Sequence, residues 1–233
     1  RFLFLLLAST IVDFIAAKRV ASSPCRISKN RWLLVSLCSN LGILCFFKYF
    51  NFFAENFVHI LEGVGMNADY ITLNLILPVG VSFYTFQTLS YTIDVYRGKL
   101  KPCQSVLDFA LYVSFFPQLV AGPIERATRL LPQISNDRVT KRADVENGIW
   151  LIVLGFAKKL VIADNCARIV DYSFDTEFAG ESGINTGLVV VLFAFQIYGD
   201  FSGYSDIARG TSKLFGFNLM VNFKRPYLVS NIS

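Results

Sequence analysis

The sequence predicts an all-α, polytopic integral membrane protein. Of its 233 residues, 54% are hydrophobic and only 17% are charged, and the mean hydropathy is +0.48. These values are more apolar and less charged than those of an ordinary soluble domain. The basic residues lie in short clusters between long apolar runs, so the net charge of +5 fits cytoplasmic loops better than a nucleic-acid surface. We therefore expect a lipid bilayer, and no nucleic acid, among its partners.

Three apolar runs are long enough to cross a bilayer as helices. Residues 32–53 and 188–207 would extend about 33 and about 30 Å, against a hydrocarbon core of roughly 30 Å. Residues 71–95 are also long enough, despite Pro78. We expect each of these runs to be a crossing.

The first apolar run, residues 2–17, would extend only about 24 Å as a helix. We expect it to be a crossing whose start lies outside the sequence. The alternative of a signal peptide fits poorly, because Asp13 lies inside the run and Lys18 and Arg19 follow it.

The charges between the runs predict their orientation. Residues 18–31 hold five basic and no acidic side chains, and residues 54–72 hold no basic and three acidic ones. Residues 209–225 are again basic, four to none, whereas residues 164–185 hold one basic and five acidic side chains. Basic loops favour the cytoplasm. The shorter run 149–163 therefore also counts as a crossing, which gives five crossings and an external amino end.

Residues 106–122 form the one apolar run that the charges do not fit as a crossing. Its flanks, residues 97–101 and 122–148, hold three and five basic residues, so a crossing would leave one basic flank outside. We expect a re-entrant segment whose helix is broken by Pro117 and Gly122. A membrane tolerates such a segment only where protein or a cavity covers its backbone. An ordinary sixth crossing that breaks the charge rule once is the alternative.

Charged residues inside apolar runs are candidates for function or for pairing, because a charge at the bilayer centre costs about 2.5–3.5 kcal/mol. Lys158 and Lys159 lie deep in their run and must find anions. Carboxylates such as Asp200 or Asp206 are one set of candidates, and the phosphates of an acyl donor are the other. The full set of such charges is Asp13, Lys48, Asp94, Lys158, Lys159, Asp200 and Asp206.

The last apolar run carries too much polarity to face lipid on every side. Its polar side is either the wall of a tunnel or a surface that hydrogen-bonds to other helices. Gly199 and Gly203 form a small-xxx-small pair that would permit close helix packing. The polar residues are Gln196, Tyr198, Asp200, Ser202, Tyr204, Ser205 and Asp206.

No local motif for catalysis or metal binding is present. His59 is the one histidine, in a predicted external loop, with no triad-like arrangement around it. The five cysteines lack metal-ligand spacing, and the sequence has no glycine-rich phosphate loop and no HExxH. We expect no metal, no disulfide and no bound cofactor.

Five blocks follow one another in the later part of the sequence: LPVGVSFYTFQTLSYTIDVYRG, FFPQLVAGPIER, GFAKKLVIAD, IYGDFSGYSDIARG and FNLMVNFKRPYLVSNIS. Their order resembles the membrane-bound O-acyltransferase family, and most strongly its bacterial branch that contains alginate O-acetyltransferases and the teichoic-acid D-alanylation protein. The resemblance covers about residue 77 to the end. It implies a ring of helices around a tunnel, through which an acyl group from a cytoplasmic donor reaches a hydroxyl on the outer side.

The resemblance also implies a tunnel histidine that acts as general base. In the family pattern this histidine follows the last block, so we expect the catalytic residue beyond Ser233 and no catalytic residue within the sequence. Residues 1–233 would then be one partial transmembrane domain, inactive by itself. The residues that we expect to line the tunnel or position substrate are Gln118, Glu125, Lys158, Lys159, Asp200, Asp206, Lys224 and Arg225.

The expected function is transfer of an acyl group, acetyl in the first instance, to an extracytoplasmic polysaccharide at the inner or plasma membrane. The co-substrate would be acetyl-CoA or another acyl carrier, and other envelope-polysaccharide modification proteins would be partners. A transporter or lipid-carrier flippase is the alternative, because it also uses broken helices and buried charges. A noncatalytic scaffold of a polysaccharide-export machine is the third.

Overall fold

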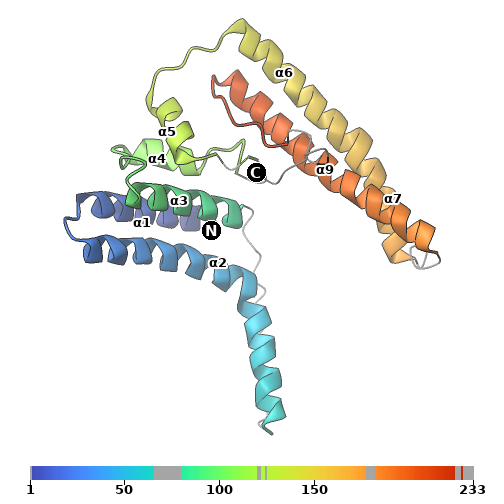
Figure 1. Ribbon diagram of the computed structural model, residues 1–233, viewed down its shortest axis with the longest axis horizontal. Helices are drawn as coiled ribbons and strands as arrows, with labels where there is room; N and C mark the ends of the chain where they lie inside the picture. Colours follow the sequence, from blue (N-terminus) through green and yellow to red (C-terminus); the bar gives the residue numbers. More distant parts are fainter. Residues whose placement is uncertain are drawn as a thin grey trace. The chain divides into compact units, whose positions relative to one another are not determined.

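The computed structural model describes residues 2–65, 80–119, 122–123, 125–176, 182–223 and 227, and every regular element within them is a helix (Figure 1). The all-α prediction is thereby confirmed. The elements are α1 (Phe2–Ser22), α2 (Arg26–Gly63), α3 (Val81–Tyr96), α4 (Val106–Val113), α5 (Ala127–Ser135), α6 (Arg142–Ala157), the π-helical segment η1 (Lys158–Ala163), α7 (Asp164–Asp175) and α9 (Gly183–Leu214).

The helices form two compact units. Unit 1 comprises Arg1–Phe115 and Arg126–Ser135, and therefore holds α1 to α5. Unit 2 comprises Phe116–Glu125 and Asn136–Ser233, and therefore holds α6, η1, α7 and α9. The segment Phe116–Glu125 thus belongs with helices that follow it in the sequence.

Two of the described helices, α2 and α9, are long and apolar enough to cross a membrane. They contain 38 and 32 residues, with a mean hydropathy of 1.7 and 1.5 in their most apolar windows. Only 11% of each window is buried, so these apolar side chains face outward, unlike those of a soluble core helix. Of the other predicted crossings, residues 71–79 lie outside the described residues, and the count of five stays a prediction.

Unit 1 is held together by a buried carboxylate and a cluster of aromatic rings. Asp13 of α1 is fully buried, and Asn40 Nδ2 of α2 donates hydrogen bonds to both of its carboxylate oxygens, at 2.9 and 2.8 Å. Ser36 Oγ donates a third, at 2.5 Å. The rings of Tyr91 and Phe109 pack beside this cluster with centroids 4.5 Å apart. The carboxylate of Asp13, whose charge would be costly in a bilayer, therefore accepts its hydrogen bonds from neutral donors.

The apolar run 106–122 does break where proline and glycine were predicted to break it. Helix α4 ends at Val113, before Pro117, whose ring disfavours helical geometry in the preceding residue. At Gly122 a Cβ atom would lie 2.5 Å from the Cα of Gln118, so only glycine permits this tight packing. The helix break is confirmed, and the re-entrant path stays a prediction.

Unit 2 is built on two antiparallel helical rods, α6 with η1 and α7, and α9, which lie alongside one another (Figure 1). A Cβ on Gly155 would lie 2.5 Å from the carbonyl oxygen of Gly203, and a Cβ on Gly210 would lie 2.5 Å from that of Gly148. Gly199 approaches Ala163 in the same way. The predicted close packing at Gly199 and Gly203 is confirmed, because the missing side chains let the backbones touch.

Candidate functional site

The π-helical segment η1 sets the direction of Lys158 and Lys159. A π turn closes i→i+5 hydrogen bonds and adds a residue to the helical turn, a feature that is frequent at functional sites. Lys158 and Lys159 open the segment, and Asp164 follows it directly. Lys158 pairs with Asp206 of α9, whereas Lys159 pairs with Asp164, which lies five residues further along the chain.

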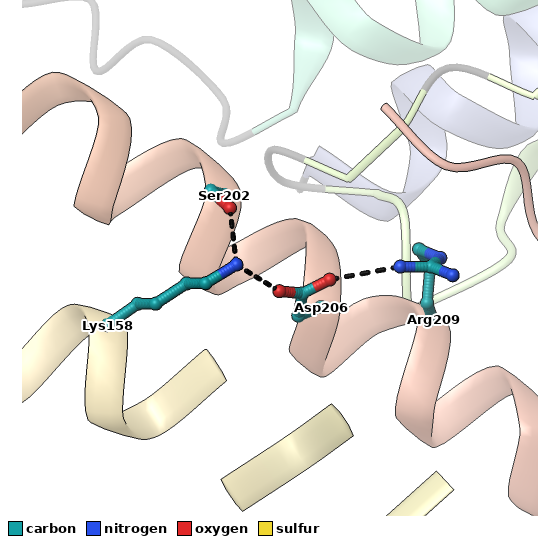
Figure 2. A network of polar contacts seen from close by, with 4 residues as sticks. All are labelled: Lys158, Ser202, Asp206 and Arg209. Atoms are coloured by element: carbon teal, nitrogen blue, oxygen red, sulfur yellow. Dashed lines mark hydrogen bonds and ion pairs between the residues drawn. The ribbon is translucent and has the colours of Figure 1, made fainter. Parts of the chain in front are cut away.

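Lys158 is the centre of a polar network between η1 and α9 (Figure 2). Its Nζ donates hydrogen bonds to Ser202 Oγ at 2.8 Å and to Asp206 Oδ2 at 2.6 Å. Arg209 Nη1 donates to the other carboxylate oxygen of Asp206 at 3.0 Å. Ser202, Asp206 and Arg209 share one face of α9, because helical residues three or four apart are neighbours. One carboxylate therefore bridges two cations.

These three charged side chains are largely shielded from solvent. The exposed fractions are 19% for Lys158, 11% for Asp206 and 18% for Arg209. Such pairs interact more strongly than solvent-exposed pairs, because the surrounding dielectric is low. The network thus links η1 to the face of α9 that carries Ser202, Asp206 and Arg209.

Lys159 belongs to a second, more open ion-pair group. Its Nζ lies 2.5 Å from Asp200 Oδ1 and 2.8 Å from Asp164 Oδ1. About 45% of the Lys159 side chain is exposed. Lys159 and Asp200 line a small pocket of about 240 Å³ together with Phe201, Tyr204 and Ile207. Of the two kinds of anion predicted for the lysines, the structure therefore provides protein carboxylates for both.

Gln118 and Glu125 lie in the segment of unit 2 that follows the break after α4. Glu125 is fully buried, and its Oε2 accepts a hydrogen bond from the backbone N–H of Met220 at 2.9 Å. Gln118 is 3% exposed, and neither polar atom of its amide has a hydrogen-bond partner in the part of the chain that the structure describes. The ring of Phe116 packs on that of Phe215, with centroids 5.9 Å apart. The segment is thus tied to the chain that leaves α9.

That chain returns along α9 toward its middle. Phe223 packs on Phe201 with ring centroids 6.4 Å apart, and the hydroxyl of Tyr227 donates to the carbonyl oxygen of Ala194 at 2.7 Å. The Tyr227 ring also lies 6.0 Å from that of Tyr198, which in turn lies 5.7 Å from Lys158 Nζ. The predicted site residues Lys224 and Arg225 lie outside the described residues.

His59 does not lie in a loop, because α2 continues to Gly63 and carries it; the prediction was wrong because the apolar run ends well before the helix does. Its Nδ1 atom lies 3.5 Å from Glu62 Oε2, and 78% of the His59 side chain is exposed.

The sequence predicts Arg209 only as part of a basic cytoplasmic segment, and not as a member of the Lys158 network. Its spacing of three from Asp206 is the signal that would have placed it in the network.

Among the described residues, no group of three histidine, cysteine or acidic side chains could hold a metal ion. What the arrangement offers instead is hydrogen-bond donors, carboxylates and cations held within apolar helices. Such groups can orient polar or anionic parts of a substrate, and the apolar helices around them can exclude water.

Comparison of the chain with known proteins identifies its family. The chain is 35% identical over 233 residues to a probable alginate O-acetylase from Pseudomonas aeruginosa, covering all of this chain and 44% of that protein. It is 34% identical over 258 residues to a peptidoglycan O-acetyltransferase from Helicobacter pylori, covering all of this chain and 48% of that protein.

A teichoic acid D-alanyltransferase from Bacillus subtilis is more distant, at 27% identity over 169 residues, or 68% of this chain and 40% of that protein. The chain spans less than half the length of these curated relatives. The model of the membrane-bound O-acyltransferase family matches residues 103–232, which include η1, α9 and the residues of both ion-pair groups. The chain belongs to the membrane-bound O-acyltransferase family.

Proposed function

We propose that the protein is a multi-pass O-acyltransferase of the cell membrane that moves an acyl group from a cytoplasmic donor to a hydroxyl of an extracytoplasmic polysaccharide. The donor is acetyl-CoA or another acyl carrier, and the group moved is acetyl. Residues 1–233 form part of a single transmembrane domain. Support for the reaction class comes from the relatives, which are named as O-acetyl and D-alanyl transferases.

The observation that carries the proposal is the shielded network of Lys158, Asp206 and Arg209 between apolar helices. Charges of this kind are costly in a membrane and are retained where a polar substrate must pass or react. A simple helix-packing role would be served by the glycine contacts of α6 and α9 alone. The network therefore fits the wall of a passage for polar groups.

In the reaction, the acceptor hydroxyl oxygen attacks the acyl carbonyl carbon. A new C–O bond forms, the bond between the acyl group and its carrier breaks, and the hydroxyl proton passes to a general base. The family pattern assigns that base to a histidine that follows residue 233, and we assign none of the described residues to it. The chain's own contribution is to line the passage and position substrates, through Gln118, Glu125, Lys158, Lys159, Asp200, Asp206, Lys224 and Arg225.

The test uses membranes that carry the protein as its own gene encodes it. Membranes are supplied with acetyl-CoA labelled in the acetyl group, or with a labelled acyl carrier thioester, and with polysaccharide acceptor on the opposite side. We expect alkali-labile label on the polysaccharide, and less of it with Lys158→Met than with the exposed control Arg142→Gln. Movement of polysaccharide without covalent labelling would favour a transporter, and neither labelling nor movement would favour a scaffold.

A further inference from the structure

Two buried polar atoms at the Lys158 network have no hydrogen-bond partner among the described residues. They are Ser205 Oγ and Arg209 Nε, and Ser205 as a whole is 2% exposed. The two residues are four apart in α9, so they share a face of the helix. Buried donors are almost always satisfied in folded proteins, so a pair of orphans on one face indicates a missing partner.

The net charge of the network also indicates a missing partner, in this case an anion. Lys158 and Arg209 contribute two positive charges and Asp206 one negative charge, which leaves one positive charge in a largely shielded place. The Lys159 group holds one net negative charge, because Asp164 and Asp200 both pair with Lys159, but Asp200 lies about 14 Å along the helix axis from Arg209. An anion bound next to Arg209 would balance the positive charge of the Lys158 network locally.

The geometry of Arg209 favours a particular class of counter-ion. Asp206 is bonded to Nη1, which leaves the edge of the guanidinium that carries Nε unused. A guanidinium edge binds planar or tetrahedral oxyanions in a forked manner, and the Ser205 hydroxyl can donate a further hydrogen bond. Figure 2 shows Asp206 between Lys158 and Arg209, so that the carboxylate holds the guanidinium in place.

We propose that Ser205 and Arg209 form a binding site for an oxyanion, a phosphate or carboxylate, that a substrate brings into unit 2. That the oxyanion belongs to a transferase substrate rests on the proposed function, whereas the anion site itself does not. A phosphate would come from the acyl donor, and a carboxylate would come from an acidic sugar of the acceptor. Both sources present the same chemistry to the guanidinium edge.

The first experiment measures anion binding without reference to activity. The protein as its gene encodes it is purified in detergent, and its unfolding midpoint is followed while inorganic phosphate or acetate replaces chloride at constant ionic strength. We expect the midpoint to rise with one of these oxyanions. Arg209→Gln should weaken the apparent affinity about tenfold or more, and Ser205→Ala should weaken it several-fold.

Arg142→Gln is the matched control, because it removes an arginine charge that is 92% exposed and paired only within α6. It should leave the anion effect unchanged. Ser205→Ala keeps every charge, so it decides the matter where Arg209→Gln folds poorly. Equal stabilisation by chloride and by both oxyanions, or an unchanged response in both variants, would overturn the site.

The second experiment identifies the source of the anion. With acyl transfer measured, Arg209→Lys should raise KM about tenfold for one substrate only: the donor if the ligand is its phosphate, the acceptor if the ligand is its carboxylate. Unchanged KM for both substrates would contradict a substrate role. A protein with no transferase activity that still binds phosphate or acetate through Arg209 would refute the proposed function and leave the anion site standing.

Discussion

Units 1 and 2 each bury a carboxylate among apolar helices, and they satisfy it with different partners. Asp13 in unit 1 is met by an amide and a hydroxyl, and no cation lies within ion-pair distance of it among the described residues. Asp206 in unit 2 is met by two cations. In the first cluster the carboxylate oxygens accept hydrogen bonds from neutral donors, whereas the second holds two cations to one carboxylate, and two of its donors have no partner among the described residues. Satisfied hydrogen bonds are typical of a structural cluster, and buried donors without partners are typical of a site that awaits a ligand.

The strongest way to break this comparison is Asp206→Ala. It leaves Lys158 and Arg209 largely shielded without a carboxylate, so the free energy of unfolding should fall by about 3–5 kcal/mol. Denaturant unfolding in detergent measures the loss. The same substitution at Asp171, an exposed residue of α7, should cost less than about 0.5 kcal/mol. Equal losses at the two positions would contradict the importance of the network.

In unit 1, Asn40→Ala removes both hydrogen bonds that the amide donates to Asp13. The carboxyl would keep only the hydroxyls of Ser36 and Thr88, and the free energy of unfolding should fall by about 1.5–3 kcal/mol. Asn56→Ala on the same helix is the control, since its side chain is exposed and bonds only to a backbone carbonyl. If the two substitutions lower the free energy of unfolding by the same amount, the stability of the Asp13 cluster does not depend on its neutral donors.

The packing that carries the unit 2 network can be tested with single methyl groups. Gly155→Ala places a Cβ about 2.5 Å from the backbone oxygen of Gly203, so α6 and α9 must separate, at a cost of about 1–3 kcal/mol. Gly187→Ala meets nothing within 4 Å and should instead stabilise α9 by about 0.5–1 kcal/mol. Thermal unfolding of both variants would show opposite shifts, and shifts of the same sign would refute the close approach.

The smallest effect is expected from Arg142→Gln. The Arg142 and Glu146 side chains are 92% and 64% exposed, and their pair spans one helical turn. Its removal should change the free energy of unfolding by about 0.5 kcal/mol or less. A loss above about 1 kcal/mol, measured by the same denaturant titration, would show that exposure does not separate the weak pairs from the strong ones.

Much of this organisation was predictable from periodicity, charge and residue type. The helical class followed from the long apolar runs, and the break after α4 followed from Pro117 and Gly122. The cost of charge in lipid predicted that Lys158 and Lys159 need anions, with Asp200 and Asp206 as one of two sets of candidates. The close packing at Gly203 could be predicted because glycine has no side chain, and this is known from the sequence alone.

Other features depend on three-dimensional register and were not predictable. The π turn at Lys158 decides which lysine faces Asp206, and no residue type announces an added residue in a helical turn. The placement of Phe116–Glu125 with later helices depends on long-range packing. The end of α2 was misplaced because polar residues continue a helix as readily as apolar ones once it has formed.

The most direct test of the account compares acyl transfer per folded molecule in Asp206→Asn and Asn40→Ala, with labelled acetyl donor and polysaccharide acceptor. We predict that Asp206→Asn lowers the rate at least about tenfold, which corresponds to about 1.4 kcal/mol of transition-state stabilisation. Asn40→Ala should lower stability but leave the rate per folded molecule within about twofold. A wild-type rate in Asp206→Asn, or an equal loss in both variants, would contradict the claim that unit 2 serves the reaction and that the Asp13 cluster in unit 1 is structural.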